Sequence, residues 1–243
     1  MPASKVTPRY IADHIRRVLK DGGSAPHSAE VQWFFKEQVR SRGWYTAELR
    51  KVAHRFRRSI MTERGLLFLV QVADGLFTGR VLEEKVFGVF LLEGLTGQLG
   101  RREFKLLASW LDRVSSWADH DGLVHSLLSP MVCADAKYCP EVFRWTKSKN
   151  RWRRRAACVA LIRGARVKKL FPEIVRTSQT LLSDEDDMVQ KGLGWLLREA
   201  AKYDARKTVP YLMKIRERAP RLVLRTACET LPAETKKKIL ARN

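Results

Sequence analysis

The chain has 243 residues, a formal net charge of +21 at pH 7 and a sequence pI of about 10.3. Such an excess of positive charge favours a polyanionic partner, most simply nucleic acid. A protein that binds the surface of a membrane is the other option. The sequence has no lipidation motif or long amphipathic anchor, however, and no apolar stretch long enough to span a bilayer.

The composition also bounds the organisation of the chain. Hydrophobic residues make up 45% of it, enough to bury a core, and we expect a single domain over residues 1–243. The first five residues, Met-Pro-Ala-Ser-Lys, lack the apolar run of a secretion signal. We therefore expect a cytoplasmic protein, and we further expect it to be nucleoid-associated, bacterial and monomeric.

The predicted elements are helices from one end of the chain to the other, and strand-like alternation is hard to find. Apolar residues recur at spacings of three and four in 53–60, 66–72, 81–92, 104–111, 156–162 and 193–201. Helix starts are expected at Thr46 and at Ser183-Asp184-Glu185. Breaks are expected at Asp21-Gly22, Arg42-Gly43, Asp74-Gly75, Gly100, Ser129-Pro130, Phe171-Pro172 and Ala219-Pro220. The predicted fold class is therefore all-α.

A cationic position recurs along these helices. The ladder comprises Arg50, Lys85, His120, Arg155, Lys191 and Arg225, with steps of 34 to 36 residues. A repeat of this length is typical of helix-pair solenoids, although a chain so rich in Lys and Arg can also produce such a ladder by chance. The repeat hypothesis predicts a curved stack of antiparallel helix pairs with a basic stripe along its concave face.

The motifs of several enzyme classes are absent. The glycines form no phosphate-binding fingerprint, and neither Gly-x-Ser-x-Gly nor His-Glu-x-x-His occurs. The cysteines, Cys133, Cys139, Cys158 and Cys228, form no Cys-x-x-Cys pair and have no histidine at zinc spacing. We expect structural thiols and neither a metal nor another cofactor.

Tryptophans set among cations are the most informative local feature. Trp117 is followed four residues later by Asp121, Trp152 lies in the basic run 151–155, and Trp195 lies in a glycine-containing helical segment. Cations meet phosphates while aromatic rings meet sugars and bases, so this pattern favours a nucleic-acid site. A lone acid there repels phosphates and needs a reason, although a helix cap or a salt bridge would also account for it.

The segment 188–202 predicts an amphipathic helix. Lys191, Trp195, Arg198 and Lys202 share one face, while the opposite side can pack through Leu193, Leu196, Leu197, Ala200 and Ala201. A tryptophan on the basic face favours a ligand contact. The alternative is a ring that caps a helix contact among snorkelling cations.

These segments resemble the AlkD-type DNA alkylation repair glycosylases, which are built from HEAT-like helical repeats. The resemblance covers about residues 25–230. Its most specific parts are the run from Gln190 to Glu199, Ser116-Trp117 with Asp121, Arg155-Ala156-Ala157, and Phe34-Phe35-Lys36 through Gly43 and Thr46.

The resemblance implies roles for particular residues. The catalytic carboxylate falls on Asp121, the two tryptophans that embrace DNA fall on Trp117 and Trp195, and the phosphate-binding arginine falls on Arg155. With the basic face and the ladder, the expected DNA contacts are Arg155, Lys191, Arg198, Phe34, Arg50, Lys85 and Arg225. Asp119 lies on another helical face and is expected to have no catalytic role, and His120 a structural or phosphate-facing one.

The implied activity is excision of positively charged alkylated purines, such as 7-methylguanine and 3-methyladenine, from double-stranded DNA. The sequence departs from the family at Ser116, often Trp, at Ala118, often an acid, and at Phe34, which lacks a hydroxyl used by some members. A non-enzymatic repeat protein that recognises distorted or branched DNA is the alternative function. A helical scaffold for acidic proteins is a third.

Overall fold

The computed structural model describes residues 6–241, and these are overwhelmingly helical. No β-strand is assigned within this range, and the one β-bridge there joins Arg40 to Val81. The all-α prediction is confirmed. No helix within the described range is long and apolar enough to cross a membrane. The prediction made from the first five residues lies outside the part of the chain that the structure describes.

The helices group into two compact units, which divide between Leu127 and Leu128. The single domain expected over residues 1–243 stays a prediction. The N-terminal unit contains α1 (Pro8–Asp21), α2 (Ala25–Gln32), α3 (Thr46–Phe77), α4 (Leu82–Leu92), α5 (Arg101–Ser109) and α6 (Trp117–Leu123). Short 3-10 segments, Thr96–Gln98 and Trp110–Arg113, flank α5, and a π-helical turn, Val124–Leu128, follows α6.

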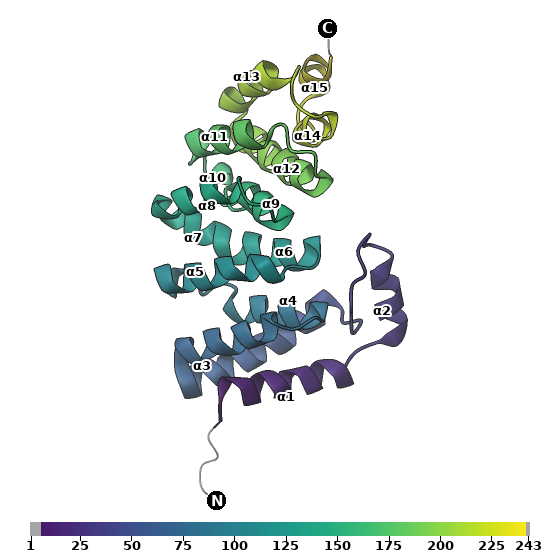
Figure 1. Ribbon diagram of the computed structural model, residues 1–243, viewed down its shortest axis with the longest axis vertical. Helices are drawn as coiled ribbons and strands as arrows, with labels where there is room; N and C mark the ends of the chain where they lie inside the picture. Colours follow the sequence, from purple (N-terminus) through teal and green to yellow (C-terminus); the bar gives the residue numbers. More distant parts are fainter. Residues whose placement is uncertain (1–5, 242–243) are drawn as a thin grey trace, which may run out of the picture. The chain divides into compact units, whose positions relative to one another are not determined.

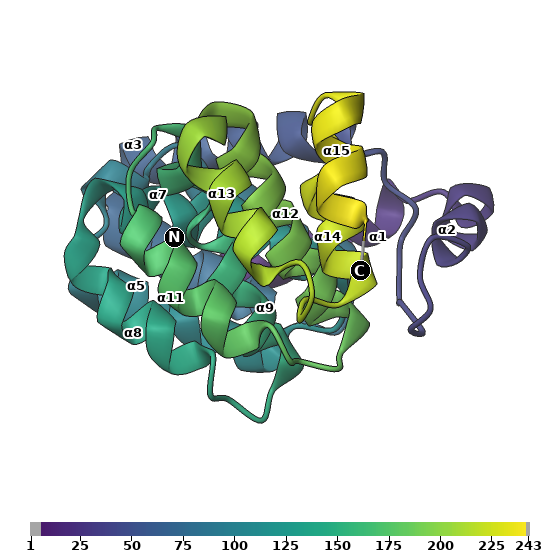
Figure 2. The ribbon, with the colours of Figure 1, turned by 90° about the horizontal axis from the view of Figure 1, so that it is seen from above.

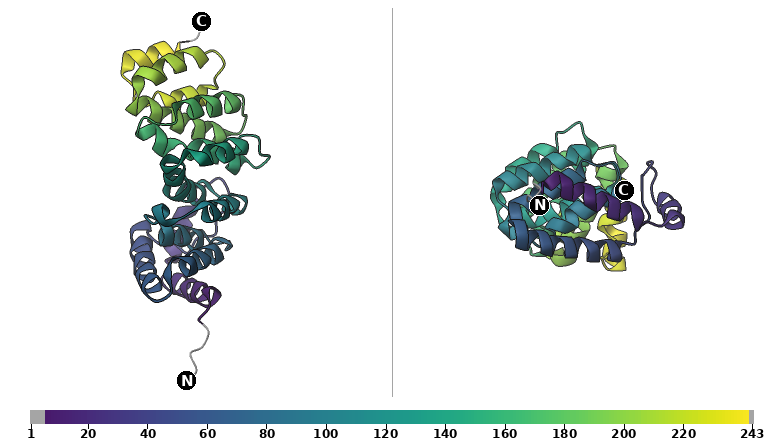
Figure 3. Two further views of the ribbon diagram at one scale, coloured as in Figure 1. Left: turned by 90° about the vertical axis from the view of Figure 1, so that its left-hand side faces the viewer. Right: turned by 90° about the horizontal axis from the view of Figure 1, so that it is seen from below.

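Three helices of the N-terminal unit lie side by side. α3 packs against both α1 and α4 (Figure 1). The core between them is apolar, and within it the ring of Phe77 stacks on Trp110 with centroids 4.4 Å apart. α2 is different: none of its residues is buried, and it lies to one side of α1, α3 and α4 (Figures 2 and 3).

The long helix α3 is two helical segments joined at Gly65. This glycine has a φ of +79°, in the left-handed region that glycine adopts most readily, which explains why the apolar periodicity breaks between residues 60 and 66. The break expected at Asp74-Gly75 is wrong, because the helix continues to Phe77. Asp74 instead accepts hydrogen bonds from Trp110 Nε1 at 2.8 Å and Arg113 Nη1 at 3.0 Å.

The C-terminal unit is built around α12 (Asp187–Tyr203), which packs against α9 (Arg151–Val159), α10 (Ile162–Arg166), α13 (Ala205–Ile215) and α14 (Arg221–Ala227) (Figures 1 and 2). The remaining helices are α7 (Ser129–Ala134), α8 (Cys139–Trp145), α11 (Phe171–Leu181) and α15 (Ala233–Leu240), with a 3-10 segment at Ala136–Tyr138. Phe171-Pro172 begins a helix after a break in the chain, as expected. The break expected at Ser129-Pro130 is wrong, because the residues on both sides of it are helical.

Two glycines explain how closely α12 approaches its neighbours. A Cβ atom on Gly194 would lie 2.6 Å from Cβ of Thr226 on α14, and one on Gly192 would lie 3.0 Å from Cγ of Arg155 on α9. Any larger side chain would collide at Gly194. The glycine-containing run that carries the family resemblance therefore includes positions that the packing of the repeat requires.

Ion pairs connect positions about one repeat apart. Lys85 pairs with Asp119, Arg154 with Asp184 and Arg166 with Glu199, at sequence separations of 34, 30 and 33 residues. Arg198 pairs in the same way with Glu229, 31 residues further on. All four pairs lie within one unit or the other. This recurrence of a link between successive helix pairs supports the repeat hypothesis.

The cationic ladder is not an exposed stripe. Lys85, His120 and Arg155 are buried, with exposed fractions of 3%, 0% and 5%, whereas Arg225 and Lys191 are exposed and Arg50 is half-buried. Lys85 and Arg155 have their partners on neighbouring helices, at Asp119 and at the carbonyl of Met188, so their side chains lie between helices and not in solvent. The prediction of a basic stripe through all six positions is therefore wrong.

Candidate functional site

The N-terminal unit contains a largely apolar pocket of about 450 Å³. It lies among the segment that follows α2 and helices α3, α4 and α6. Four of the residues singled out from the sequence line it: Phe34, Arg50, Trp117 and Asp121. An apolar pocket with few polar groups is the usual form of a binding site, so this is the main candidate in the unit.

Asp121 supplies the carboxylate of the pocket. Its side chain is 22% exposed, and its Oδ1 lies 2.6 Å from Nδ1 of His120, whose side chain is completely buried. A buried imidazole in contact with the carboxylate fixes the direction in which that carboxylate points. The phosphate-facing alternative for His120 is wrong, because a fully buried side chain presents nothing to a phosphate.

The neighbouring acid, Asp119, holds the start of α6 in place. Its carboxylate accepts hydrogen bonds from the backbone N–H and hydroxyl groups of Ser115 and Ser116 and from Nζ of Lys85, at 2.7 to 3.0 Å. Together with Ser116 it forms a capping box. Asp119 is fully buried and, as expected, is not part of the pocket.

The ion pair with Asp119 holds the side chain of Lys85 between α4 and α6. The ammonium group donates to Asp119, to the hydroxyl of Ser115 and to the carbonyl of Arg113. Three donors held by three buried or half-buried acceptors leave none for a phosphate. The prediction that Lys85 contacts DNA is therefore wrong, and the residue joins α4 to α6 instead.

Trp117 lies one helical turn before Asp121 on α6 and borders the same pocket. The residue is 38% exposed, and one face of its ring stacks on Phe35, with centroids 5.0 Å apart and planes inclined by 24°. Phe35 comes from the segment after α2, so the two aromatic rings connect that segment to α6. Phe34, the residue that precedes Phe35, is 73% exposed.

Arg50 forms another edge of the pocket. Its guanidinium lies 4.3 Å from the ring centroid of Phe90, and its Nε lies 3.1 Å from Oε2 of Glu93. Both contacts hold the side chain on α3 against α4. About two-fifths of the side chain stays exposed, so part of its charge faces solvent at the pocket.

The C-terminal unit has its own candidate surface on α12. As predicted, Leu193, Leu196, Leu197, Ala200 and Ala201 are buried, while Lys191 and Lys202 are exposed and Trp195 and Arg198 are half-buried. Two of the cations pair with acids: Nζ of Lys191 lies 3.2 Å from Oδ2 of Asp187, and Arg198 pairs with Glu229. Arg225, on α14, is exposed.

Arg155 connects two helices of the same unit. Its Nη1 donates to the carbonyl of Met188 at 2.7 Å, and its aliphatic stem passes Gly192. The side chain therefore lies between α9 and α12 and belongs to no exposed stripe. Its phosphate contact, implied by the family resemblance, stays a prediction.

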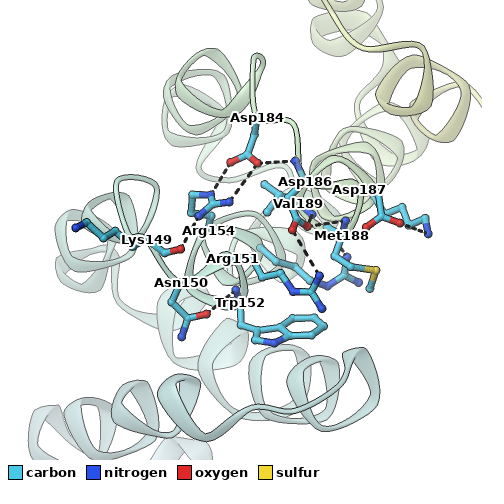
Figure 4. A network of polar contacts seen from close by, with 12 residues as sticks. Lys149, Asn150, Arg151, Trp152, Arg154, Asp184, Asp186, Asp187, Met188 and Val189 are labelled. Carbon is cyan, nitrogen blue, oxygen red and sulfur yellow. Dashed lines mark hydrogen bonds and ion pairs between the residues drawn. The ribbon is translucent and has the colours of Figure 1, made fainter. Parts of the chain in front are cut away.

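The rest of the basic run 151–155 is also held by acids. Figure 4 shows Arg154 between Asp184 and the loop before α9, where it donates to the carbonyls of Ser148 and Lys149. Arg151 approaches Asp186, with Nη1 3.6 Å from Oδ2 (Figure 4). Trp152 is buried in the core. In this run the alternation of cations and an aromatic residue marks helix packing more than a nucleic-acid surface.

The cysteines lie away from the pocket. All four are free thiols, and burial raises the pKa of Cys139 to about 11 and that of Cys158 to about 12. Thiols with such pKa values stay protonated at neutral pH and are poor nucleophiles. Among residues 6–241 no group of three His, Cys, Asp or Glu side chains is placed to hold a metal ion.

Sequence reasoning did not single out two aromatic residues of the segment after α2. Phe35, which lines the pocket, figured only within the resemblance, and Trp33, two residues before it, was not considered. Their positions depend on contacts between segments far apart in the chain, such as Phe35 with Trp117. The run of three aromatic residues, 33–35, was the one local signal that could have pointed to this segment.

Comparisons with known proteins agree with this architecture. The model of a family described as DNA alkylation repair enzymes matches residues 15–231. A predicted DNA alkylation repair enzyme from Enterococcus faecalis is similar in structure, with a TM-score of 0.77 and 17% identity over 87% of this chain and 97% of that one. AlkD2 from Streptococcus mutans has a TM-score of 0.58 and 18% identity over 75% and 90% of the two chains.

No curated protein sequence gives a significant match. At 17% and 18% identity the structural similarities show a shared fold. The family match rests on a different basis, because it extends over nearly the whole chain, and it confirms the resemblance to this family. The chain belongs to the DNA alkylation repair enzyme family.

Proposed function

We propose that the protein is a monofunctional DNA glycosylase that excises positively charged alkylated purines from double-stranded DNA. The observation that carries this proposal is the position of Asp121. A partly exposed carboxylate, held by a buried histidine, borders an apolar pocket beside an exposed tryptophan. In a chain with a net charge of +21, an acid in such a place suits a reaction that develops positive charge.

The chemistry follows from the charge of the lesion. Alkylation at N7 or N3 makes the purine cationic, so the base leaves with the electron pair of the N-glycosidic bond and becomes neutral. Positive charge then moves onto the deoxyribose, and water adds at C1′ with loss of a proton. A carboxylate beside the sugar stabilises the oxocarbenium-like transition state and can orient that water. We assign this role to Asp121.

The tryptophans would act on the same charge. The face of an indole ring attracts a nearby cation, so Trp117 and Trp195 can stabilise the cationic base or sugar while they position the nucleotide. Trp117 is half-exposed at the pocket, and Trp195 lies on the face of α12 that carries Lys191 and Arg198. Both positions suit a contact with DNA.

Further contacts with DNA are assigned to Phe34, Arg50, Lys191, Arg198, Arg225 and Arg155. Phe34 and Arg50 border the pocket in the N-terminal unit, and the other four belong to the C-terminal unit. Cations that meet phosphates set the register of a protein on the duplex without reading its sequence. This suits an enzyme that finds one kind of damage in any sequence context.

Three departures from the family pattern are compatible with the proposal. Ser116 forms the capping box with Asp119, so it has a structural task that a tryptophan could not perform. Ala118 lies at the pocket and adds no second acid to it. The missing hydroxyl at Phe34 removes one polar group, and the reaction as written does not need it.

The direct test is release of free base. The purified protein is incubated with duplex DNA carrying 7-methylguanine, and the released base and the remaining abasic site are measured. Release in an amount equal to the abasic sites formed is expected. Binding of the duplex with no release above the uncatalysed rate would contradict the glycosylase and leave the non-enzymatic DNA-binding function.

A further inference from the structure

Two large aromatic side chains stand in solvent next to the pocket. Trp33 is 91% exposed and Phe34 is 73% exposed, in the turn that follows α2. Exposed apolar side chains that occur singly need no explanation, but adjacent rings on a protruding segment are typical of a binding surface. The inference drawn here rests on the proposed DNA substrate.

The carboxylate of Glu83 anchors residues 41–44, which follow the aromatic turn in the chain. Glu83, buried at the start of α4, accepts hydrogen bonds from the backbone N–H groups of Arg42 at 2.8 Å, Gly43 at 2.9 Å and Trp44 at 3.4 Å. The hydroxyl of Ser41 donates to it as well, at 2.6 Å. A carboxylate that satisfies successive backbone donors holds the loop in one conformation.

Further hydrogen bonds hold together the segment between α2 and α3 and tie it to α1. The side chain of Gln32 donates to the carbonyl of Glu37 at 2.9 Å and accepts from the backbone N–H of Val39 at 3.0 Å. The indole Nε1 of Trp44 donates to the carbonyl of Leu19 at 2.8 Å. Gly43 has a φ of +75°, and a Cβ atom there would lie 2.0 Å from the carbonyl oxygen of Ser24. The aromatic turn is therefore presented by an ordered support.

The same segment is continuous with the proposed site. Phe35, which follows the two exposed rings, stacks on Trp117, and Phe34 lines the pocket that contains Asp121. Lys36 and Arg40, close by in the sequence, are exposed cations. Rings bordered by cations suit a ligand with flat faces and phosphates, which is the chemistry of a nucleic acid.

We propose that Trp33 and Phe34 form a stacking surface for DNA bases beside the lesion, at a base step where the duplex is weakened. Every base has a flat face that an aromatic ring can stack on, so such a contact tolerates any sequence. Apolar side chains that enter a base step unstack it at a cost that falls when the step is already damaged. The surface would therefore favour damaged over intact duplex.

The test measures binding without excision. Two fluorescent duplexes are compared: one fully paired and one with a tetrahydrofuran abasic analogue at its centre, next to 2-aminopurine as a reporter of stacking. Dissociation constants are measured over a range of salt concentrations for the wild type, Trp33→Ala, Trp33→Phe and the double variant Trp33→Ala/Phe34→Ala. Tyr10→Ala is the matched control, because Tyr10 is an exposed aromatic residue of the same unit on α1.

Trp33→Ala is expected to weaken binding of the abasic duplex by about tenfold, the scale of one lost stacking contact. The slope of log affinity against log salt should not change, because no charge is removed. Trp33→Phe should restore most of the affinity, and Tyr10→Ala should leave it unchanged. Affinities of Trp33→Ala and the double variant within twofold of the wild type on both duplexes would overturn the proposal.

A second variant tests the support. Glu83→Gln removes a negative charge and on charge alone would strengthen DNA binding. We expect it to weaken binding of the abasic duplex, because the loop that presents the rings loses its charged acceptor. Affinity equal to or above the wild type, in a variant that melts as a folded protein, would contradict an ordered stacking surface.

Failure of this proposal differs from failure of the proposed enzyme. Base release from 7-methylguanine duplex is measured in parallel with the same variants. A wild type that needs Trp33 for binding but releases no base removes the glycosylase and leaves the stacking surface. A wild type that releases base while Trp33→Ala binds both duplexes as well as the wild type removes the stacking surface alone.

Discussion

Two acids of α6, only two residues apart, have different surroundings. Asp119 is buried, accepts five hydrogen bonds and neutralises Lys85, whereas Asp121 is partly exposed and contacts the imidazole of His120. The helical periodicity puts the first acid at the helix start and the second at the pocket. One acid therefore fixes the start of the helix, and the other borders the pocket.

His120 should matter through the orientation of Asp121. His120→Leu removes the group in contact with the carboxylate, and we expect base release at saturating enzyme to slow by about tenfold or more, since small misplacements are costly. His120→Asn places an amide nitrogen near the position of Nδ1 and should recover much of the rate. DNA affinity should stay within about threefold of the wild type for both variants. Equal rates for His120→Leu and the wild type would remove His120 from the account.

Asp119→Asn should reduce stability more than activity. It leaves the buried ammonium of Lys85 without a counter-charge, and we expect a loss of about 3 kcal/mol in the free energy of unfolding, measured by chemical denaturation. Asp13→Asn is the control, because Asp13 pairs with Arg16 on the surface and should cost less than about 1 kcal/mol. The same small loss for both variants would show that the buried pair is not needed.

At the scale of single residues, the sequence could suggest Asp121 and Trp117 because both fall in one short helical motif. It could not place Lys85 or Arg155, since their partners, Asp119 and the carbonyl of Met188, are 34 and 33 residues away. A cation that pairs across a helix contact and one that meets a phosphate look the same in a sequence.

At the scale of elements, close approach between helices depends on glycines, which have no side chain to keep the helices apart. Gly194 lets α12 approach α14 at Thr226, and Gly192 makes room for the stem of Arg155. The ion pairs that join positions one repeat apart add to this packing. The helix start at Thr46 and the break at Phe171-Pro172, where proline lies in the first turn, were predicted correctly. The break predicted at Asp74-Gly75 was wrong, and a tertiary contact uses the aspartate there.

Gly194→Ala should destabilise the C-terminal unit. The new methyl group would lie 2.6 Å from Cβ of Thr226, and overpacking of this kind costs about 1–3 kcal/mol. Gly122→Ala is the matched control: nothing lies within 4 Å of its Cβ position, and a helical glycine replaced by alanine stabilises by roughly 0.5–1 kcal/mol. Thermal unfolding of the two variants should shift in opposite directions, and a Gly194→Ala variant as stable as the wild type would contradict the close packing.

At the scale of the whole molecule, net charge overstates the DNA-binding surface. Many cations are paired with acids, and of the ladder and α12 cations Arg50, Lys191, Arg198, Lys202 and Arg225 keep exposed or half-buried positions. If about four cations meet phosphates, affinity should fall on the order of 10²-fold between about 50 and 200 mM salt. Arg225→Ala should reduce the slope of log affinity against log salt by about 0.9. Affinity independent of salt over this range would contradict phosphate-dominated binding.

The central claim is that the carboxylate of Asp121 stabilises positive charge in the excision of a cationic base. Single-turnover release of 7-methylguanine from duplex DNA, with saturating wild type and Asp121→Asn, tests it most directly. Asn keeps the size of the side chain and removes its charge, so the rate should fall by about 10² or more, the scale for one preorganised electrostatic group. DNA affinity should be retained or increased, because a charge that repels phosphates is gone. Equal rates for Asp121→Asn and the wild type would contradict the claim.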